Sequence, residues 1–142
     1  MKNTIYSIIV FLLLFTMSCQ TSNNKENKIE KIQIEAMDMD ILTTISIDCD
    51  KFIGDVDYSI TDTAEINVFL RQLENLEPLD SGNWSVDTRA KVILYSANDT
   101  NTICAGLILK YNDKFYHTPE WLIEYINNLT DECYDAKAKI TQ

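Results

Sequence analysis

The side chains best suited to chemistry in this sequence are four cysteines, Cys19, Cys49, Cys104 and Cys133. A cysteine can ligate a metal, attack a substrate or pair with a second thiol in a disulfide. No two of them form a CxxC pair, so their spacing predicts neither a redox motif nor a zinc knuckle. Their chemistry therefore depends on the compartment in which the chain folds.

Carboxylates form a second group, because aspartates make three D-x-D pairs between positions 38 and 57. A calcium loop needs oxygen ligands at alternate positions and a glycine for its sharp turn. Counted from Asp48, the fifth and sixth positions hold Phe52 and Ile53, so this pattern fails. We interpret the carboxylates as a solvated surface and predict no metal site. The aspartates concerned are Asp38, Asp40, Asp48, Asp50, Asp55 and Asp57.

His117 is the only histidine and precedes a predicted helix. Nucleophilic catalysis needs a nucleophile and an orienting group beside such a base, yet there is no G-x-S-x-G motif and the three glycines are scattered. A phosphate loop or a dinucleotide fingerprint would need clustered glycines. The sequence therefore predicts a surface histidine, no cofactor and a protein that is not an enzyme.

Trp84 is the most suggestive single residue for binding. It lies in a polar segment, DSGNWSV, that contains Gly82. A large aromatic side chain in such a loop often anchors a partner. The alternative is that Trp84 folds back over the end of the sheet.

The first eighteen residues have the order of a secretory signal. Lys2 gives a positive start, residues 5–15 are almost entirely apolar, and a small residue, Ser18, precedes Cys19. The apolar run is shorter than the roughly 20 residues that a membrane-spanning helix needs. The domain after Cys19 is therefore predicted to be exported into a compartment that permits disulfides.

The end of this leader resembles the lipobox of bacterial lipoproteins, with Thr16, Met17, Ser18 and Cys19 at the matching positions. The resemblance implies cleavage after Ser18 and lipidation of Cys19, and several acyl chains anchor a protein stably. By analogy with that family, Gln20 favours the outer membrane of a Gram-negative bacterium. The alternative is an ordinary signal peptide in which Cys19 is incidental. The remainder of the chain resembles no family of known function.

Length and charge indicate the number of domains and argue against some classes of partner. Removal of residues 1–18 leaves 124 residues, which is the size of one domain. The formal charge of −10 for the whole chain argues against nucleic acid as a partner, because phosphate binding needs clustered Lys and Arg. It argues equally against electrostatic docking on anionic lipid.

The polar composition of residues 19–31 predicts a flexible tether that begins at the lipidated cysteine. Residues 32–40 alternate only weakly and fit either the tether or an edge strand. Residues 41–50 alternate strictly, which predicts a strand with one buried face. That face would hold Ile41, Thr43, Ile45, Ile47 and Cys49.

Two helices are predicted from their caps and their apolar stripes. Asp62 and Glu65 have the spacing of a capping box, and Pro78 follows the end of the first stripe. Thr118 is the expected cap of the second helix, with Pro119 at its first position. The stripes are Ile66, Phe69, Leu70, Leu73 and Leu76 in the first helix, and Leu122, Tyr125, Ile126, Leu129 and Cys133 in the second.

Further strands are predicted at residues 89–96, 102–111 and 115–117, the first two as an antiparallel hairpin. The order β-α-β-β-β-α predicts an α+β fold, in which an antiparallel sheet of about four strands carries two helices on one face. We expect one domain over residues 32–136 and a disordered tail at 137–142.

This topology also selects one disulfide among three pairings. A helical crossover makes the strand at 41–50 parallel to the strand at 89–96, so Cys49 comes level with Cys104. Cys133, at the far end of the last helix, stays a buried free thiol. One observation opposes this pairing, since the alternation places Cys49 and Cys104 on opposite faces.

Together these patterns predict a lipid-anchored envelope protein whose domain is a binding or interaction module, with an unknown protein or glycan as its partner. The alternative is a small exported hydrolase or carbohydrate-handling enzyme that uses scattered Asp and Glu residues.

Overall fold

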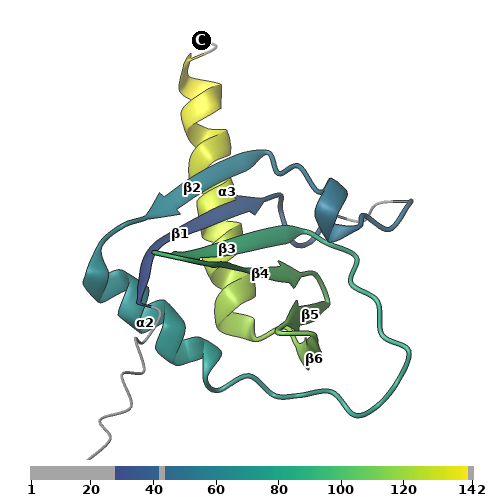
Figure 1. The fold of residues 1–142 in the computed structure, drawn as a ribbon. Helices are drawn as coiled ribbons and strands as arrows, with labels where there is room; N and C mark the ends of the chain where they lie inside the picture. Colours follow the sequence, from purple (N-terminus) through teal and green to yellow (C-terminus); the bar gives the residue numbers. More distant parts are fainter. Residues whose placement is uncertain (1–27, 42–43, 141–142) are drawn as a thin grey trace, which may run out of the picture.

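The computed structural model describes residues 28–41 and 44–140, which form an α+β domain (Figure 1). The predicted signal peptide, Cys19 and most of the predicted tether lie outside the described residues. The two helices are α2 (Thr63–Leu73) and α3 (Glu120–Ile140), and a 3-10 turn, η1, spans Cys49–Lys51. The strands are β1 (Ile29–Ala36), β2 (Val56–Ile60), β3 (Ala90–Ser96), β4 (Thr100–Ala105), β5 (Ile108–Tyr111) and β6 (Lys114–His117).

The strands of the described part form one sheet in the order β2-β1-β3-β4-β5-β6, and every neighbouring pair is antiparallel. The predicted α+β class, the antiparallel sheet and the two helices are confirmed. The sheet has six strands rather than about four, and two strands precede the first helix instead of one.

β1 lies inside the sheet, so the prediction of a tether or an edge strand for this segment is wrong. Ile32, Ile34 and Ala36 are fully buried, while Gln33 and Glu35 between them face the other side. Hydrogen bonds to β2 and β3 satisfy both edges of the strand. The alternation is complete, but the charged residues on the second face conceal it in the sequence.

The predicted strand at residues 41–50 is also wrong. In its place the described residues between β1 and β2, 37–41 and 44–55, form an irregular loop that contains η1. The loop is held by the disulfide and by hydrogen bonds to residues 87–89 instead of by strand pairing. The next strand, β2, is a short edge strand that the sequence analysis missed, with Val56 and Ile60 buried.

The connection from β2 through α2 to β3 is a crossover. Both strands are antiparallel to β1, which lies between them, so β2 and β3 are parallel to each other. The rule that a helical crossover joins parallel strands therefore holds, with β2 rather than residues 41–50 as the first strand.

α2 begins as predicted, because the Asp62 carboxylate accepts a hydrogen bond of 2.9 Å from the backbone N–H of Glu65. The other half of the capping box is absent, since the Glu65 carboxylate accepts a bond from Tyr125 instead. The helix ends at Leu73, before Leu76. Ile66, Phe69 and Leu73 are buried against the sheet, whereas Leu70 is half-buried.

The predicted hairpin of β3 and β4 is confirmed. The predicted strand at 102–111 is divided into β4 and β5 by a tight turn at Gly106 and Leu107. β5 and β6 form a second hairpin, whose two turn residues, Asn112 and Asp113, have positive φ. Asn and Asp tolerate this left-handed conformation better than most residues.

α3 is longer than predicted. It continues to Ile140, so the expected disorder is wrong for residues 137–140, while residues 141–142 lie outside the described part. The Thr118 hydroxyl has no hydrogen-bond partner and does not cap the helix; instead, the Pro119 carbonyl accepts the first helical bonds. No helix in the described part is both long and apolar enough to cross a membrane.

Both helices pack on the same face of the sheet and form one core with it. Leu122 and Ile126 of α3 are fully buried there beside Ile66 and Phe69 of α2. Burial of a side chain of this size stabilises the fold by about 1.5–3 kcal/mol. In the described part of the chain, no α-helix packs on the opposite face of the sheet.

Candidate functional site

The face of the sheet opposite the helices, called the open face below, is the first candidate site. The alternation that buries Ile34 and Val92 places the intervening side chains on this side. In the register of the sheet, one row of residues crosses all six strands. The row consists of Asp57, Glu35, Lys91, Cys104, Lys110 and Phe115.

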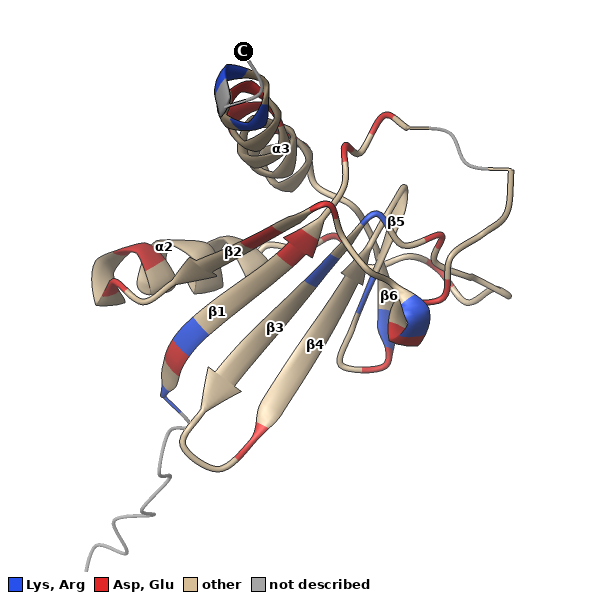
Figure 2. Ribbon diagram, turned by 90° about the horizontal axis from the view of Figure 1, so that it is seen from above, with Lys and Arg blue, Asp and Glu red and all other residues tan. Residues whose placement is uncertain are grey.

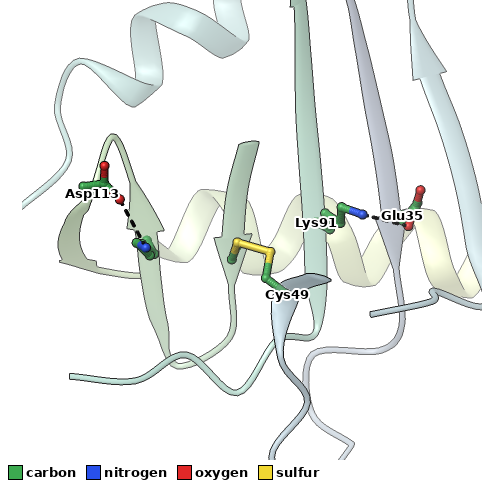
Figure 3. Close-up of a disulfide and its surroundings, with 6 residues drawn as sticks. Glu35, Cys49, Lys91 and Asp113 are labelled. Atoms are coloured by element: carbon green, nitrogen blue, oxygen red, sulfur yellow. Dashed lines mark ion pairs between the residues drawn. A yellow bond between two sulfur atoms is a disulfide. The ribbon is translucent and has the colours of Figure 1, made fainter. Parts of the chain in front are cut away.

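Charged residues of the row form ion pairs on either side of Cys104 (Figure 3). Lys91 Nζ lies 4.0 Å from Glu35 Oε2, and Lys110 Nζ lies 3.2 Å from Asp113 Oδ1. The lysines thus flank Cys104, while each binds an acid on its other side. Figure 2 shows both signs of charge on β1 and a basic residue on β3. Because the ion pairs combine Lys91 and Lys110 with acidic residues, this face is mixed rather than uniformly acidic.

A second set of polar contacts joins side chains of β2, β1 and β3. Gln33 Nε2 donates to the Asp57 carboxylate at 3.1 and 3.2 Å, and the Tyr95 hydroxyl donates to Gln33 Oε1 at 3.1 Å. Lys31 Nζ lies 5.4 Å from the centre of the Tyr95 ring, a distance suited to a cation–π contact. The side chains of the open face therefore hold one another in fixed positions.

A disulfide between Cys49 and Cys104 crosses this face, with Cα atoms 5.8 Å apart (Figure 3). The predicted pairing is confirmed, and Cys133 is a half-buried free cysteine on α3. The conflict between the faces of the two cysteines disappears, because Cys49 belongs to η1 and not to a strand. A shallow depression of about 600 Å³ adjoins the bridge, and its lining includes Asp50, Ile93 and Tyr95.

The loop at residues 37–55 is fixed to the end of the sheet where β1 ends and β3 begins, called the distal end below. The backbone of Ile47 donates to Asp87 Oδ1 and accepts from the Thr88 N–H, both at 2.9 Å. Phe52 is buried, and Gly54 packs directly on the backbone of Ala36. With the disulfide, these contacts hold the loop at four places.

Three large aliphatic side chains at the distal end are nevertheless largely exposed, more so than Ile41 of the same loop, at 41%. Ile45 and Ile53 on the loop are 78% and 84% exposed, and Leu107 in the turn between β4 and β5 is 91% exposed. We call them the distal aliphatic residues. The exposed carboxylates of Asp48, Asp50 and Asp55 lie in the same loop. Contiguous exposed apolar patches mark interaction sites, and these three side chains are the most exposed large hydrophobic residues in the described part of the chain.

Trp84 lies away from the depression. Its ring packs over Gly82, and its indole N–H donates to the Asp80 carbonyl at 2.8 Å. The side chain is 40% exposed and lines a separate groove of about 200 Å³ with Pro78 and Phe115. Trp84 therefore folds back on its own loop, which is close to the alternative expectation that it folds over the end of the sheet. The distal aliphatic residues were not among the sites predicted from the sequence.

The remaining candidates are dispersed. His117 is exposed at the end of β6, and Asp48 and Asp50 lie on the η1 turn rather than on a strand. Within residues 28–41 and 44–140, no three His, Cys, Asp or Glu side chains gather in a group that could hold a metal ion. Cys19 lies outside the described residues, so its lipidation stays a prediction.

The chain is thus an α+β domain with one face of its sheet covered by helices and the other open. No protein-family model matches it, and no match is found among the curated proteins or the solved structures. Its function must therefore be inferred from its own residues.

Proposed function

We propose that this protein is an envelope lipoprotein, anchored through Cys19, whose domain binds a partner protein through the distal aliphatic residues and the adjoining open face. The exposure of Ile45, Ile53 and Leu107 on a fixed scaffold is the observation that carries the proposal. Burial of each such side chain in a complex contributes about 1.5–3 kcal/mol. Because the scaffold is already ordered, little conformational entropy is lost on binding.

Charge favours a protein partner over a lipid surface. Asp48, Asp50 and Asp55 share the loop with two of the distal aliphatic residues, and the whole chain carries a formal charge of −10. An anionic bilayer repels such a surface. A protein with apolar pockets bordered by Lys or Arg complements it, and opposite charges also accelerate association.

The position of the anchor supports the same orientation. β1 starts at Ile29, at the end of the sheet opposite the distal aliphatic residues. Nine residues, 20–28, separate this strand from Cys19, and they reach at most about 30 Å. Anchoring through Cys19 therefore holds the end of the sheet where β1 starts near the membrane, and the distal end points away from it.

Site-specific photocross-linking tests the binding surface. We expect a photoreactive phenylalanine analogue at position 53 or 107 to yield the same discrete cross-linked protein in intact envelopes, and the same analogue at exposed position 74, at the end of α2, to yield none. An Ile45→Ser/Leu107→Ser variant should abolish the cross-link from position 53. Equal cross-linking from positions 53 and 74, or cross-links to lipid alone, would overturn the proposal.

Metabolic labelling with a palmitate analogue tests the anchor separately. We expect label on the wild-type protein and none on the Cys19→Ala variant. Unchanged label on that variant would exclude Cys19 as the lipidated residue, without affecting the cross-linking result.

A further inference from the structure

The helix-bearing side of the molecule contains a groove that the proposed function does not use. It lies between α2 and α3, with Ile60 of β2 in its lining, and has a volume of about 260 Å³. Sites for drug-sized ligands are typically about 300–1,000 Å³. A groove of this size therefore suits a compact molecule or a single side chain.

Three aromatic residues line the groove, which we call the aromatic groove: Phe69 from α2, and Trp121 and Tyr125 from α3. The Phe69 ring meets the Trp121 ring edge-on at a centroid distance of 5.3 Å and the Tyr125 ring at 6.2 Å. Phe69 is almost completely buried, so these contacts fix the cluster to the core. Val68, which is 53% exposed, adds an aliphatic wall.

The charge of the lining has one sign. Glu65 and Glu124 are the charged residues among those that line the groove, and the lining includes no Lys or Arg. The Tyr125 hydroxyl donates to Glu65 Oε1 at 3.2 Å. Burial, followed by the nearby Glu65 and Tyr58, raises the pKa of the Tyr125 phenol well above its ordinary value. The phenol therefore stays protonated and donates its hydrogen bond to Glu65.

We propose that the aromatic groove binds a small organic cation, namely an ammonium group carried on a compact apolar body. Aromatic rings attract a cation within about 6 Å of the ring centre. The two carboxylates supply opposite charge at the same place, while Val68 and Phe69 receive the apolar body. A free amine and the side chain of a basic residue in a peptide share this chemistry.

Fluorescence of Trp121 provides a direct measurement. Trp84→Phe leaves Trp121 as the only tryptophan in the chain. In this background, 2-phenylethylammonium is titrated against its neutral counterpart, 2-phenylethanol. We expect saturable quenching by the cation, at an affinity at least about tenfold higher than that of the alcohol.

Matched variants assign the effect to the groove. Glu65→Gln combined with Glu124→Gln should reduce the preference for the cation to about threefold or less, whereas Glu74→Gln, at the exposed end of α2, should leave it unchanged. If loss of Glu65 disturbs the fold, as judged by circular dichroism, Glu124→Gln alone serves as the test.

A dipeptide with blocked ends, acetyl-Lys-Phe-amide, distinguishes the two sources of the ammonium group. Tighter binding of the dipeptide assigns the groove to a basic peptide segment, and tighter binding of phenylethylammonium assigns it to a free amine. Equal affinities for cation and alcohol, or no saturable change with any of the three up to about 10 mM, would overturn the proposal.

Discussion

Gly106 packs so closely on Asp87 that a Cβ atom at position 106 would lie 2.0 Å from the Asp87 carbonyl oxygen. The carboxylate of the same aspartate accepts the backbone N–H of Ile47 at 2.9 Å. Asp87 thus connects the turn that carries Leu107 to the loop that carries Ile45. The two exposed regions of the distal end are held by one residue.

Gly106→Ala is therefore expected to destabilise the domain by about 1–3 kcal/mol, because backbone must move to admit the methyl group. Denaturant unfolding monitored by circular dichroism measures the change. Gly82→Ala is the control, since the nearest atoms there belong to the Trp84 side chain, at 3.0 Å, which can shift. Equal costs at the two positions would contradict the close contact with Asp87.

Removal of the disulfide by Cys49→Ser/Cys104→Ser is expected to lower the free energy of unfolding by about 4 kcal/mol. The bridge closes a loop of 55 residues, and cross-links of that length restrict the unfolded chain to this extent. The loss should appear as a lower denaturation midpoint, and reductant should then have no further effect. Cys133→Ser provides the control, because this half-buried cysteine is unbridged and its replacement should cost much less.

On α2, Ile66→Ala is expected to cost about 2–5 kcal/mol, and more than Leu70→Ala. Ile66 is 2% exposed within the core, whereas Leu70 is half-buried and lines an open groove. Chemical denaturation of both variants tests the ranking. A larger loss for Leu70→Ala would mean that α2 is rotated about its axis relative to the arrangement described above.

The stability of the domain is expected to fall above about pH 10, and Tyr125 should contribute to that fall. A raised pKa in the folded state means that the folded protein retains a proton that the unfolded chain releases above its ordinary pKa of about 10. The contribution is complete below pH 10 and is lost as the pH rises further. Tyr125→Phe should therefore lose less stability than the wild type between pH 9 and about pH 11. Parallel pH profiles of the two proteins would refute this expectation.

Sequence patterns located the parts of this fold that are determined locally. Asp62 caps α2 through a contact three residues away, and the hairpin of β3 and β4 joins strands that are adjacent in the chain. β1 was misread because Lys31, Gln33 and Glu35 occupy the face that carries no helix, so its composition resembles a tether. The complete alternation of Ile32, Ile34 and Ala36 could have identified the strand.

For residues 41–50 the error is the opposite one, because a strand was predicted and those of them that the structure describes form none. Their alternation predicts a strand, but the tertiary contacts of Ile47 and Cys49 override it, and neither contact is visible in local sequence. The predicted disulfide is correct although its premise is not, because the crossover joins β2 to β3 and Cys49 reaches Cys104 from η1, in the segment that follows β1. Exposure of Ile53 and Leu107 could not be foreseen, since composition alone does not distinguish a core aliphatic residue from an exposed one.

The position of β1 also constrains the order in which the chain can fold. β1 is synthesised before the other strands of the sheet. Its neighbour β3 begins only at Ala90, and in the sheet Ala36 pairs with Ala90 and Ile34 with Val92. A nascent chain that ends before Ala90 can pair β1 with β2 alone, and a two-stranded ribbon is at best marginally stable in water. Contacts between distant residues form slowly because a long loop must close first. A chain that emerges amino terminus first, from a ribosome or through a narrow channel, therefore stays unfolded until most of its length is free.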